Sequence, residues 1–457
     1  MTVRRKIAPP VADPGREAAF DVLRAVDERD AYANLVLPEL LHDRGLDGRD
    51  AALATELVYG TLRGRGTYDA VLAANLDRAP EKLEPPVLDA LRLGAHQLLG
   101  TRIPAHAAVS TTVDLARVRI GEGPGKLINA VLRRVSACDL DAWVEQIAPE
   151  ASTEPVEWLA LRHSHPAWIV RAMLDALGGD LDELGHALAA NNVRPEVTLV
   201  ARPGRAGVAE LLQAGARPGR WSPYAAILTE GDPAGLAAVR ERRAGVQDEG
   251  SQLVTLALAA VPLTGPDTRW LDMCAGPGGK AALLGGLATQ RGARLLAVER
   301  QPHRARLVEN ALRDDPGGHR VLVADSTQPL QGEQPFDRVL LDAPCTGLGA
   351  LRRRPEARWR RQPSEVAGLR SLQVRLLRAA IDEVRPGGVV AYATCSPHVG
   401  ETSTVVSDVL RSRADLDRVD ARPYLPRVPD LGDGPDVQLW PHRHGTDAMY
   451  LALLRRR

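Results

Sequence analysis

The sequence predicts a multidomain fold in which an all-α bundle is followed by a Rossmann-like α/β domain. The chain has 457 residues, which is more than one hydrophobic core usually organises. Apolar residues recur at intervals of three and four up to about residue 140, and from about residue 245 short apolar runs alternate with helical patterns. We therefore expect an all-helical domain over residues 1–145, a small α/β connector over 146–240 and the Rossmann-like domain over 241–457.

The N-terminal domain carries the signals of several successive helices. Asp13 before Pro14 is typical of an N-cap with proline at the first helical position. Further helices are expected after Asp50, from the Pro85-Pro86 pair, and at the apolar stripes of residues 109–116 and 127–135. No strand-like alternation interrupts them, so the prediction is a helical bundle with short loops.

The connector mixes both kinds of element. A helical pattern covers residues 158–188 with a break near Gly178-Gly179, a strand is expected at 197–200, and a helix at 208–212. These elements together favour a small α/β subdomain.

The C-terminal domain alternates strands with helices. Strands are expected at residues 270–273, 294–298, 320–324, 338–341 and 389–394, and helices at 280–289, 303–312 and 366–384. This alternation predicts a parallel sheet with helices on both faces. Residues 437–440 and 449–453 could add a closing antiparallel pair.

Composition excludes several classes of protein. No apolar run approaches the ~20 residues of a membrane span, and no apolar segment follows the basic start at residues 1–6, so a cytoplasmic protein without membrane partners is expected. None of the four cysteines forms a C-x-x-C pair, which disfavours a zinc site, and a disulfide framework is not expected either. A monomer without metal is the simplest expectation.

Positive charge is concentrated although the chain is neutral overall. Residues 101–136 hold six basic residues against Asp114 and Glu122, and residues 350–378 hold nine arginines against Glu356 and Glu365. Such segments can bind phosphates, and Trp359 could stack on a base. The alternatives are a solvated helix face and a tryptophan in the core.

A glycine-rich turn between a strand and a helix is the sharpest local signal. It runs from Asp272 through Cys274, Ala275, Gly276, Pro277, Gly278 and Gly279 to Lys280. Such a turn brings backbone N–H groups close to a ligand, although a tight turn without a ligand is the alternative. The next strand ends at Glu299, where a doubly wound fold can bind ribose hydroxyls, and the third ends at Asp325. A helix N-cap is the alternative for each acidic residue. The combination favours a nucleoside-containing cofactor.

Two cysteines follow the last two predicted parallel strands. Cys345 lies in Asp342-Ala-Pro-Cys-Thr-Gly, and Cys395 lies in Tyr392-Ala-Thr-Cys-Ser. A thiolate can add to carbon 6 of cytosine, which makes carbon 5 nucleophilic toward a sulfonium methyl group, and Asp342 could stabilise charge on the N3 and N4 edge of the base. Spacing alone leaves open which cysteine attacks, and a packed thiol is the alternative for each.

These three motifs together resemble the RNA cytosine-5 methyltransferases of the Sun/nucleolar-protein family. Residues 247–252 and 441–447 resemble its entry and closing segments, and the helical part resembles the NusB-type RNA-binding bundle fused to bacterial 16S ribosomal RNA methyltransferases. The resemblance implies S-adenosylmethionine as cofactor and RNA, most simply 16S ribosomal RNA, as partner.

The resemblance also implies residue roles. Cys395 would be the nucleophile, Cys345 would assist product release, and Asp342 would contact the cytosine. The cofactor site would comprise Cys274, Ala275, Gly276, Pro277, Gly278, Gly279, Lys280, Glu299, Asp325 and Asp342. Gly276, Thr346 and Ala393 depart from the family pattern by small changes that remove no reactive group. Transfer RNA as substrate, or a non-catalytic RNA-binding factor, are the alternatives.

Overall fold

The computed structural model describes residues 12–457, which form two compact units. Unit 1 contains the chain up to Arg171 together with Asp180–Asn192 and Leu351–Arg360. Unit 2 contains Ala172–Gly179, Val193–Ala350 and Arg361–Arg457. The three-part division with boundaries near residues 145 and 240 stays a prediction. The basic segment at residues 1–6 lies outside the described residues.

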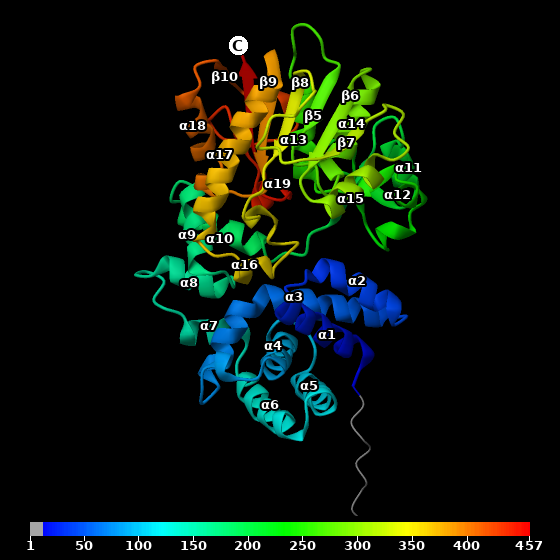
Figure 1. Cartoon of the computed structure of the whole chain (residues 1–457). Coiled ribbons are helices and arrows are strands. Elements are labelled where there is room, and N and C mark those ends of the chain that lie inside the picture. The colour runs from blue at the N-terminus through cyan, green and yellow to red at the C-terminus, as the bar shows by residue number, and fades with distance from the viewer. Residues whose placement is uncertain (1–11) are drawn as a thin grey trace, which may run out of the picture. The chain divides into compact units, whose positions relative to one another are not determined.

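Unit 1 is helical, as predicted (Figure 1). Its helices are α1 (Pro14–Arg29), α2 (Ala33–Asp43), α3 (Gly48–Ala74), α4 (Pro85–Leu99), α5 (Ala105–Arg119), α6 (Glu122–Val135), α7 (Leu140–Ile147), α8 (Pro155–Arg162), α10 (Leu181–Ala190) and the short α16 (Ala357–Arg360), while α9 (Ala167–Ala176) runs across the boundary between the units. Asp13 caps α1 as predicted, because its carboxylate accepts from the Arg16 N–H at 3.0 Å. The sequence prediction missed α2 and α7.

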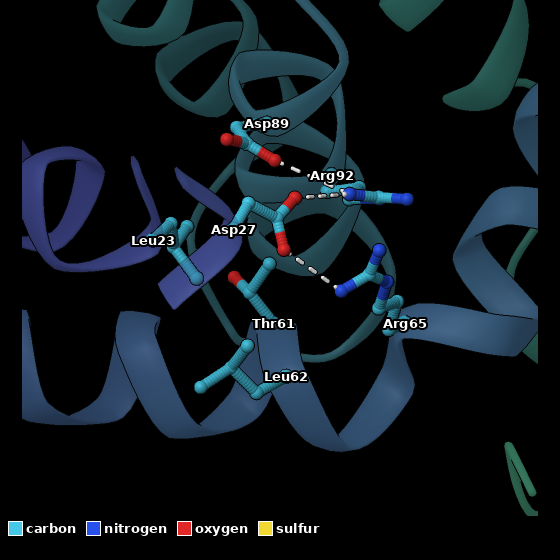
Figure 2. A pocket seen from close by; sticks show the side chains of 7 residues that line it. All are labelled: Leu23, Asp27, Thr61, Leu62, Arg65, Asp89 and Arg92. Carbon is cyan, nitrogen blue, oxygen red and sulfur yellow. Dashed lines mark hydrogen bonds and ion pairs between the residues drawn. The ribbon is translucent and has the colours of Figure 1, made fainter. Parts of the chain in front are cut away.

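A partly buried ion network lies between α1, α3 and α4 of unit 1 (Figure 2). The Arg92 guanidinium, 7% exposed, donates to Asp69 at 2.7 and 2.8 Å, to Asp27 at 3.1 Å and to Asp89 at 3.2 Å. Arg65 donates to the other oxygen of Asp27 at 2.9 Å. Each carboxylate therefore has a guanidinium partner, which buried charge requires.

A small antiparallel sheet opens unit 2. Its strand order is β2 (Ala216–Pro218), β3 (Ala225–Leu228), β1 (Val197–Ala201) and β4 (Ala244–Val246), and the short helices α11 (Val208–Gln213) and α12 (Ala237–Arg240) accompany it. The strand at 197–200 and the helix at 208–212 are confirmed. Strands β2, β3 and β4 were not predicted.

The large sheet of unit 2 has the strand order β10-β12-β9-β8-β5-β6-β7, with β11 beside β12. The strands are β5 (Arg269–Asp272), β6 (Arg294–Glu299), β7 (Arg320–Val323), β8 (Phe336–Asp342), β9 (Val384–Thr394), β10 (Leu416–Val419), β11 (Val437–Gln438) and β12 (Tyr450–Arg456). Strands β5 to β9 pair in parallel, whereas β12 pairs antiparallel with β9, β10 and β11. The predicted parallel sheet and its closing antiparallel pair are thus confirmed.

Helices cover both faces of this sheet (Figure 1). They are α13 (Glu249–Ala260), α14 (Gly279–Gln290), α15 (Pro302–Leu312), α17 (Glu365–Glu383), α18 (Ser403–Ser412) and α19 (Pro441–His444). One core contains Trp270 and residues of α13 and α14, and the other contains Leu271 and residues of α17 and α18. Because neighbouring residues of β5 face opposite cores, the strand is apolar on both sides. In the described part of the chain, no helix combines the length and the apolar character that crossing a membrane requires.

Strand β5 lies between β6 and β8. The connection after β5 therefore runs toward one edge of the sheet, and the connection after β8 runs toward the other edge. A ligand crevice forms outside the carboxyl ends of parallel strands at such a switch point. The residues after β5, β6, β8 and β9 are those that the sequence singled out.

Candidate functional site

The glycine-rich turn joins β5 to α14 with its backbone tightly folded. Gly278 has a φ of +109°, which a side chain would strain, and its N–H donates to the Ala275 carbonyl at 2.7 Å. The Ala275 N–H donates to Val298 of β6 at 3.0 Å, which fixes the turn against the next strand. No side chain caps the N-terminus of α14. Its first N–H groups are therefore available to a ligand with negative or polar groups.

Two buried side chains at this turn have no hydrogen-bond partner. Both carboxylate oxygens of Asp272, which is fully buried, and both amide atoms of Gln247, 7% exposed, are unsatisfied. The Gln247 amide lies 3.9 Å from the position that a Cβ of Gly279 would occupy. Buried polar groups are usually satisfied, so these atoms fit a polar ligand that completes their hydrogen bonds. Neither residue was among the predicted site residues, although both lie in the motifs that the sequence showed.

The acidic residues at the ends of β6 and β7 are held by local hydrogen bonds. Glu299 is 5% exposed and accepts from the N–H groups of Gly276 at 3.1 Å and Gln301 at 2.9 Å. A Cβ on Gly276 would come within 2.3 Å of the Glu299 carboxylate, so glycine here leaves room for that side chain. Asp325 is more exposed and is held by Thr327 through its N–H at 3.0 Å and its hydroxyl at 2.8 Å.

The structure brings the two predicted cysteines together. Their Sγ atoms lie 3.4 Å apart, one in the loop after β8 and one directly after β9. Between β5 and β8, the Lys280 ammonium donates to the Asp342 carboxylate at 2.8 Å. One crevice therefore holds two thiols beside a lysine–aspartate pair.

The two thiols differ in their electrostatic environment. The hydrogen bond from Cys345, aided by the positive charge of Lys280, lowers the pKa of Cys395 against the effects of burial and of Asp342. The same hydrogen bond, together with burial and the charge of Glu401, raises the pKa of Cys345 well above its usual value. A lowered pKa increases the fraction of thiolate, which is the reactive form of a cysteine.

Lys280 keeps its charge in spite of burial. Desolvation opposes the ammonium, but the carboxylate of Asp342 outweighs it and raises the pKa of Lys280. For Cys274, in contrast, desolvation and the neighbouring carboxylates of Asp272, Asp342 and Glu299 raise the pKa of the thiol well above the usual value, and the charge of Arg304 offsets this only in part. Cys274 therefore suits a contact residue of the turn and not a nucleophile.

The predicted entry and closing segments meet beside these loops. The Asp447 N–H donates to the Asp248 carboxylate at 3.1 Å, and the Ala448 N–H donates to the Gly349 carbonyl at 2.9 Å. Gly349 in turn donates to the Cys395 carbonyl at 2.9 Å. The closing segment thus supports the loops of both cysteines.

Part of the arginine-rich segment is anchored inside unit 1, whereas other arginines of the segment, such as Arg354, Arg375 and Arg378, are exposed. Residues Leu351–Arg360 leave unit 2 and pack in unit 1, where Arg358 is fully buried. Its guanidinium donates to the carbonyls of Arg63 at 3.1 Å, Ser164 at 3.1 Å and Asn191 at 2.9 Å. Three further carbonyls, of residues 26, 30 and 31, accept from Arg360.

Trp359 packs against α3 of unit 1, and packing inside the protein was the alternative to stacking on a base. A Cβ on Gly66 of α3 would come within 2.4 Å of the Trp359 ring, so glycine at this position admits the indole. Arg358, Trp359 and Arg360 are therefore anchoring side chains, and the prediction of a phosphate contact is wrong for Arg358 and Arg360, while it stays a prediction for the exposed arginines. The sequence could not show this, because a charge count does not distinguish exposed from buried guanidinium groups.

Comparisons with known proteins agree with this site. The family model described as 16S rRNA methyltransferase RsmB/F matches residues 261–455, and the NusB family model matches residues 13–137. A ribosomal RNA small subunit methyltransferase B from Pseudomonas putida is 33% identical over 451 residues, which cover 96% of this chain and 98% of that protein. The chain belongs to the RsmB/F methyltransferase family.

Other relatives support this membership. A Mycobacterium tuberculosis protein that carries the name of a methyltransferase is 55% identical over 446 residues, 97% of each chain. The crystal structure of PH0851 covers 99% of this chain and 100% of its own with a TM-score of 0.79 at 23% identity. NSun6 from Pyrococcus horikoshii, solved with SFG, covers 64% of this chain and 98% of its own with a TM-score of 0.54 at 17% identity. These two structures show the fold alone.

Membership confirms what the resemblance implied about the reaction. As an RsmB/F methyltransferase with a NusB domain, the chain is an S-adenosylmethionine-dependent RNA cytosine-5 methyltransferase. The unsatisfied atoms of Asp272 and Gln247 and the uncapped start of α14 fit that cofactor, which carries ammonium, sulfonium, carboxylate and ribose groups.

Proposed function

We propose that this chain methylates carbon 5 of a cytosine in 16S ribosomal RNA, with Cys395 as the nucleophile. The observation that carries the proposal is the pair of Sγ atoms at 3.4 Å beside the Lys280–Asp342 ion pair. The choice of RNA is supported by the names of relatives such as the Pseudomonas putida ribosomal RNA small subunit methyltransferase B.

Cys395 begins the reaction as a thiolate. Its lowered pKa favours the charged form, and the Cys345 thiol beside it can donate the hydrogen bond that stabilises that form. The thiolate sulfur bonds to carbon 6 of the cytosine, and the electron pair of the carbon 5–carbon 6 double bond becomes available at carbon 5. The target base has to be unstacked to reach the thiolate.

Asp342 and Lys280 orient the base and the charge that develops on it. The Asp342 carboxylate can accept from the N4 amino group, while the Lys280 ammonium at 2.8 Å from Asp342 holds that carboxylate in place. A charged pair in a partly buried site stabilises charge more strongly than it does in water.

The cofactor supplies a methyl group on a positively charged sulfur. Around it, the N–H groups that start α14 are suited to its carboxylate, and Glu299 and Asp325 are suited to its ribose hydroxyls. The remaining predicted contacts are residues 274–280, with Asp342 at the border between cofactor and base.

Release of the product requires that the bond between the Cys395 sulfur and carbon 6 breaks. After methylation, a base takes the proton from carbon 5, the electron pair of that C–H bond restores the carbon 5–carbon 6 double bond, and the carbon 6–sulfur bond breaks, so that Cys395 leaves as a thiolate. Cys345, whose sulfur lies next to that leaving group, is the residue that we propose to assist this step.

The N-terminal unit is the proposed contact to the RNA outside the target nucleotide, because the NusB family model covers residues 13–137.

We also propose that the protein is a monomer. Its proposed location is the cytoplasm, where ribosomal RNA is assembled.

The test of the substrate uses the full-length protein with S-adenosylmethionine and three RNAs, namely transcribed 16S ribosomal RNA, transcribed 23S ribosomal RNA and transfer RNA. The position of 5-methylcytosine is mapped in each. One modified cytosine in 16S RNA that is absent with Cys395→Ala supports the proposal. Modification of transfer RNA alone would establish the alternative substrate, and 23S RNA modified equally well would refute selectivity.

A further inference from the structure

We propose that Glu401 is a positioning residue that locks the loops of Cys345 and Cys395 together and assigns the two thiols their different roles. The residue lies outside the motifs to which the reaction was assigned, six positions after Cys395 in the chain. The inference rests on the proposed function for the meaning of the two roles, but its geometry does not depend on the identity of the RNA.

The Glu401 carboxylate bridges the residues that directly follow the two cysteines. On the Cys345 side, Glu401 accepts from the Thr346 N–H at 2.8 Å and from the Thr346 hydroxyl at 2.5 Å. On the Cys395 side, it accepts from the Ser396 hydroxyl at 2.7 Å. One buried side chain thereby fixes both loops, which start from two different strands.

Further contacts surround this carboxylate. Gln373 of α17 donates its amide to Glu401 at 3.2 Å and to the Pro344 carbonyl at 2.8 Å, and the Tyr392 hydroxyl donates to the Glu401 carbonyl at 2.6 Å. Glu401, Gln373 and Ser396 are fully buried, and Thr346 is 1% exposed. Four side-chain or backbone donors bind the carboxylate and fix its position. Residues that support a reactive site are commonly held in this way.

The charge of Glu401 acts unequally on the two thiols. It contributes to the raised pKa of Cys345, after the hydrogen bond to Cys395 and burial, whereas it is not among the main causes of the lowered pKa of Cys395. The other charged groups that act on Cys395 are Asp342, Lys280 and Asp447, and Tyr392 is the further titratable group near Cys345. Removal of the Glu401 charge should therefore lower the pKa of Cys345 and make its thiol more reactive.

The test is Glu401→Gln, which keeps the shape of the side chain and removes its charge. Each cysteine is alkylated with iodoacetamide between pH 6 and 10 without RNA or cofactor, and its rate is read by peptide mass spectrometry. In the wild type we expect Cys395 to react first. In Glu401→Gln we expect Cys345 to react about tenfold faster at pH 8.

Two further variants keep the result interpretable. Ser396→Ala removes one of the four donors while keeping the charge, so it should lower methylation without accelerating Cys345 alkylation. Glu356→Gln removes a buried carboxylate in unit 1, 1% exposed and bonded to the Ala33 N–H at 3.1 Å, and should change neither reading. If Glu401→Gln does not fold, Ser396→Ala must still lower kcat for methylation, with an unchanged KM for RNA.

Alkylation of both cysteines at wild-type rates in a folded Glu401→Gln protein would overturn the inference. The inference would also be overturned if Glu356→Gln accelerated the alkylation of Cys345 as much as Glu401→Gln does. A wild type that shows the expected thiol selectivity but methylates no ribosomal RNA would instead count against the proposed substrate, so the two failures are distinguishable.

Discussion

The Sγ atoms of Cys345 and Cys395 lie 3.4 Å apart, although fifty residues separate them in the chain. Strands β8 and β9 run in parallel side by side, with Asp342 opposite Ala393, so their carboxyl ends deliver both loops to one point. The proximity explains how one thiol can stabilise the thiolate of the other.

Lys280→Met should raise the pKa of Cys395 and impair the reaction. The ammonium is the main positive charge acting on that thiol, and its loss also leaves Asp342 without its partner at 2.8 Å. We expect kcat/KM at neutral pH to fall about a hundredfold, within the usual range for such a group, and the acid limb of the pH–rate profile to move to higher pH. Lys82→Met, at an exposed lysine of unit 1, is the control. An unmoved acid limb in Lys280→Met would contradict the role of this charge.

Asp272→Asn should abolish a pH dependence of cofactor binding. Burial and the neighbouring Asp342 raise the pKa of Asp272 to about 8, so its carboxyl group is protonated below that pH in the free protein. A cationic cofactor prefers the ionised form, and its affinity should therefore rise as the pH increases through about 8. Calorimetric titration between pH 6.5 and 9 measures this rise, which the variant should lack. Asp417→Asn, at an exposed carboxylate, should retain it, and equal slopes in all three proteins would exclude Asp272 from the cofactor site.

Arg358→Met should destabilise unit 1. The substitution leaves the carbonyls of Arg63, Ser164 and Asn191 without their buried donor, at an expected cost of about 3 kcal/mol in the free energy of unfolding. Urea denaturation measures the change. Arg354→Met, in the same segment but exposed, should cost well under 1 kcal/mol. A stable Arg358→Met protein with a reduced salt slope of RNA binding would instead favour the phosphate-binding interpretation.

Asp89→Asn should change how the stability of the bundle depends on pH. Burial and the nearby Asp27 raise the pKa of Asp89 to about 6, against a usual value of 3.8, so between these values the folded state binds a proton that the unfolded state has lost. This group therefore stabilises the folded state at low pH, and its contribution decreases as the pH rises from about 4 to about 6. The free energy of unfolding of the wild type, relative to that of the variant, should fall over this window. A constant difference from pH 4 to 7 would contradict the raised pKa.

The large sheet was predictable because its strands are buried on both faces and its helices separate them regularly. The runs Trp270–Leu271, Leu295–Val298 and Val339–Leu341 are apolar, and the glycine turn and acidic strand ends follow them directly. The cofactor and cysteine motifs could therefore be placed at one edge of the sheet from the sequence.

Other elements depend on tertiary contacts that a local pattern does not contain. Helix α2 includes Pro38, which normally argues against a helix, and β2 consists of three half-exposed or exposed residues ending in Pro218. From the sequence, Arg358 is expected to be a surface charge. Its carbonyl partners, which lie up to nearly three hundred residues away in the chain, become known only from the structure. Glu401 has no spacing signal either, since its four donors belong to Thr346, Gln373 and Ser396, and two of these residues lie far from it in the chain.

The central claim is that Cys395 attacks the base and Cys345 releases it. In the most direct measurement, Cys345→Ala and Cys395→Ala proteins are each mixed with S-adenosylmethionine and an unmodified RNA that the wild type methylates. Free protein is then separated from protein bound to RNA under denaturing conditions. The account predicts a covalent RNA–protein adduct with Cys345→Ala, mapped to Cys395, and neither adduct nor 5-methylcytosine with Cys395→Ala. An adduct formed by Cys395→Ala through Cys345 would contradict it and exchange the roles of the two thiols.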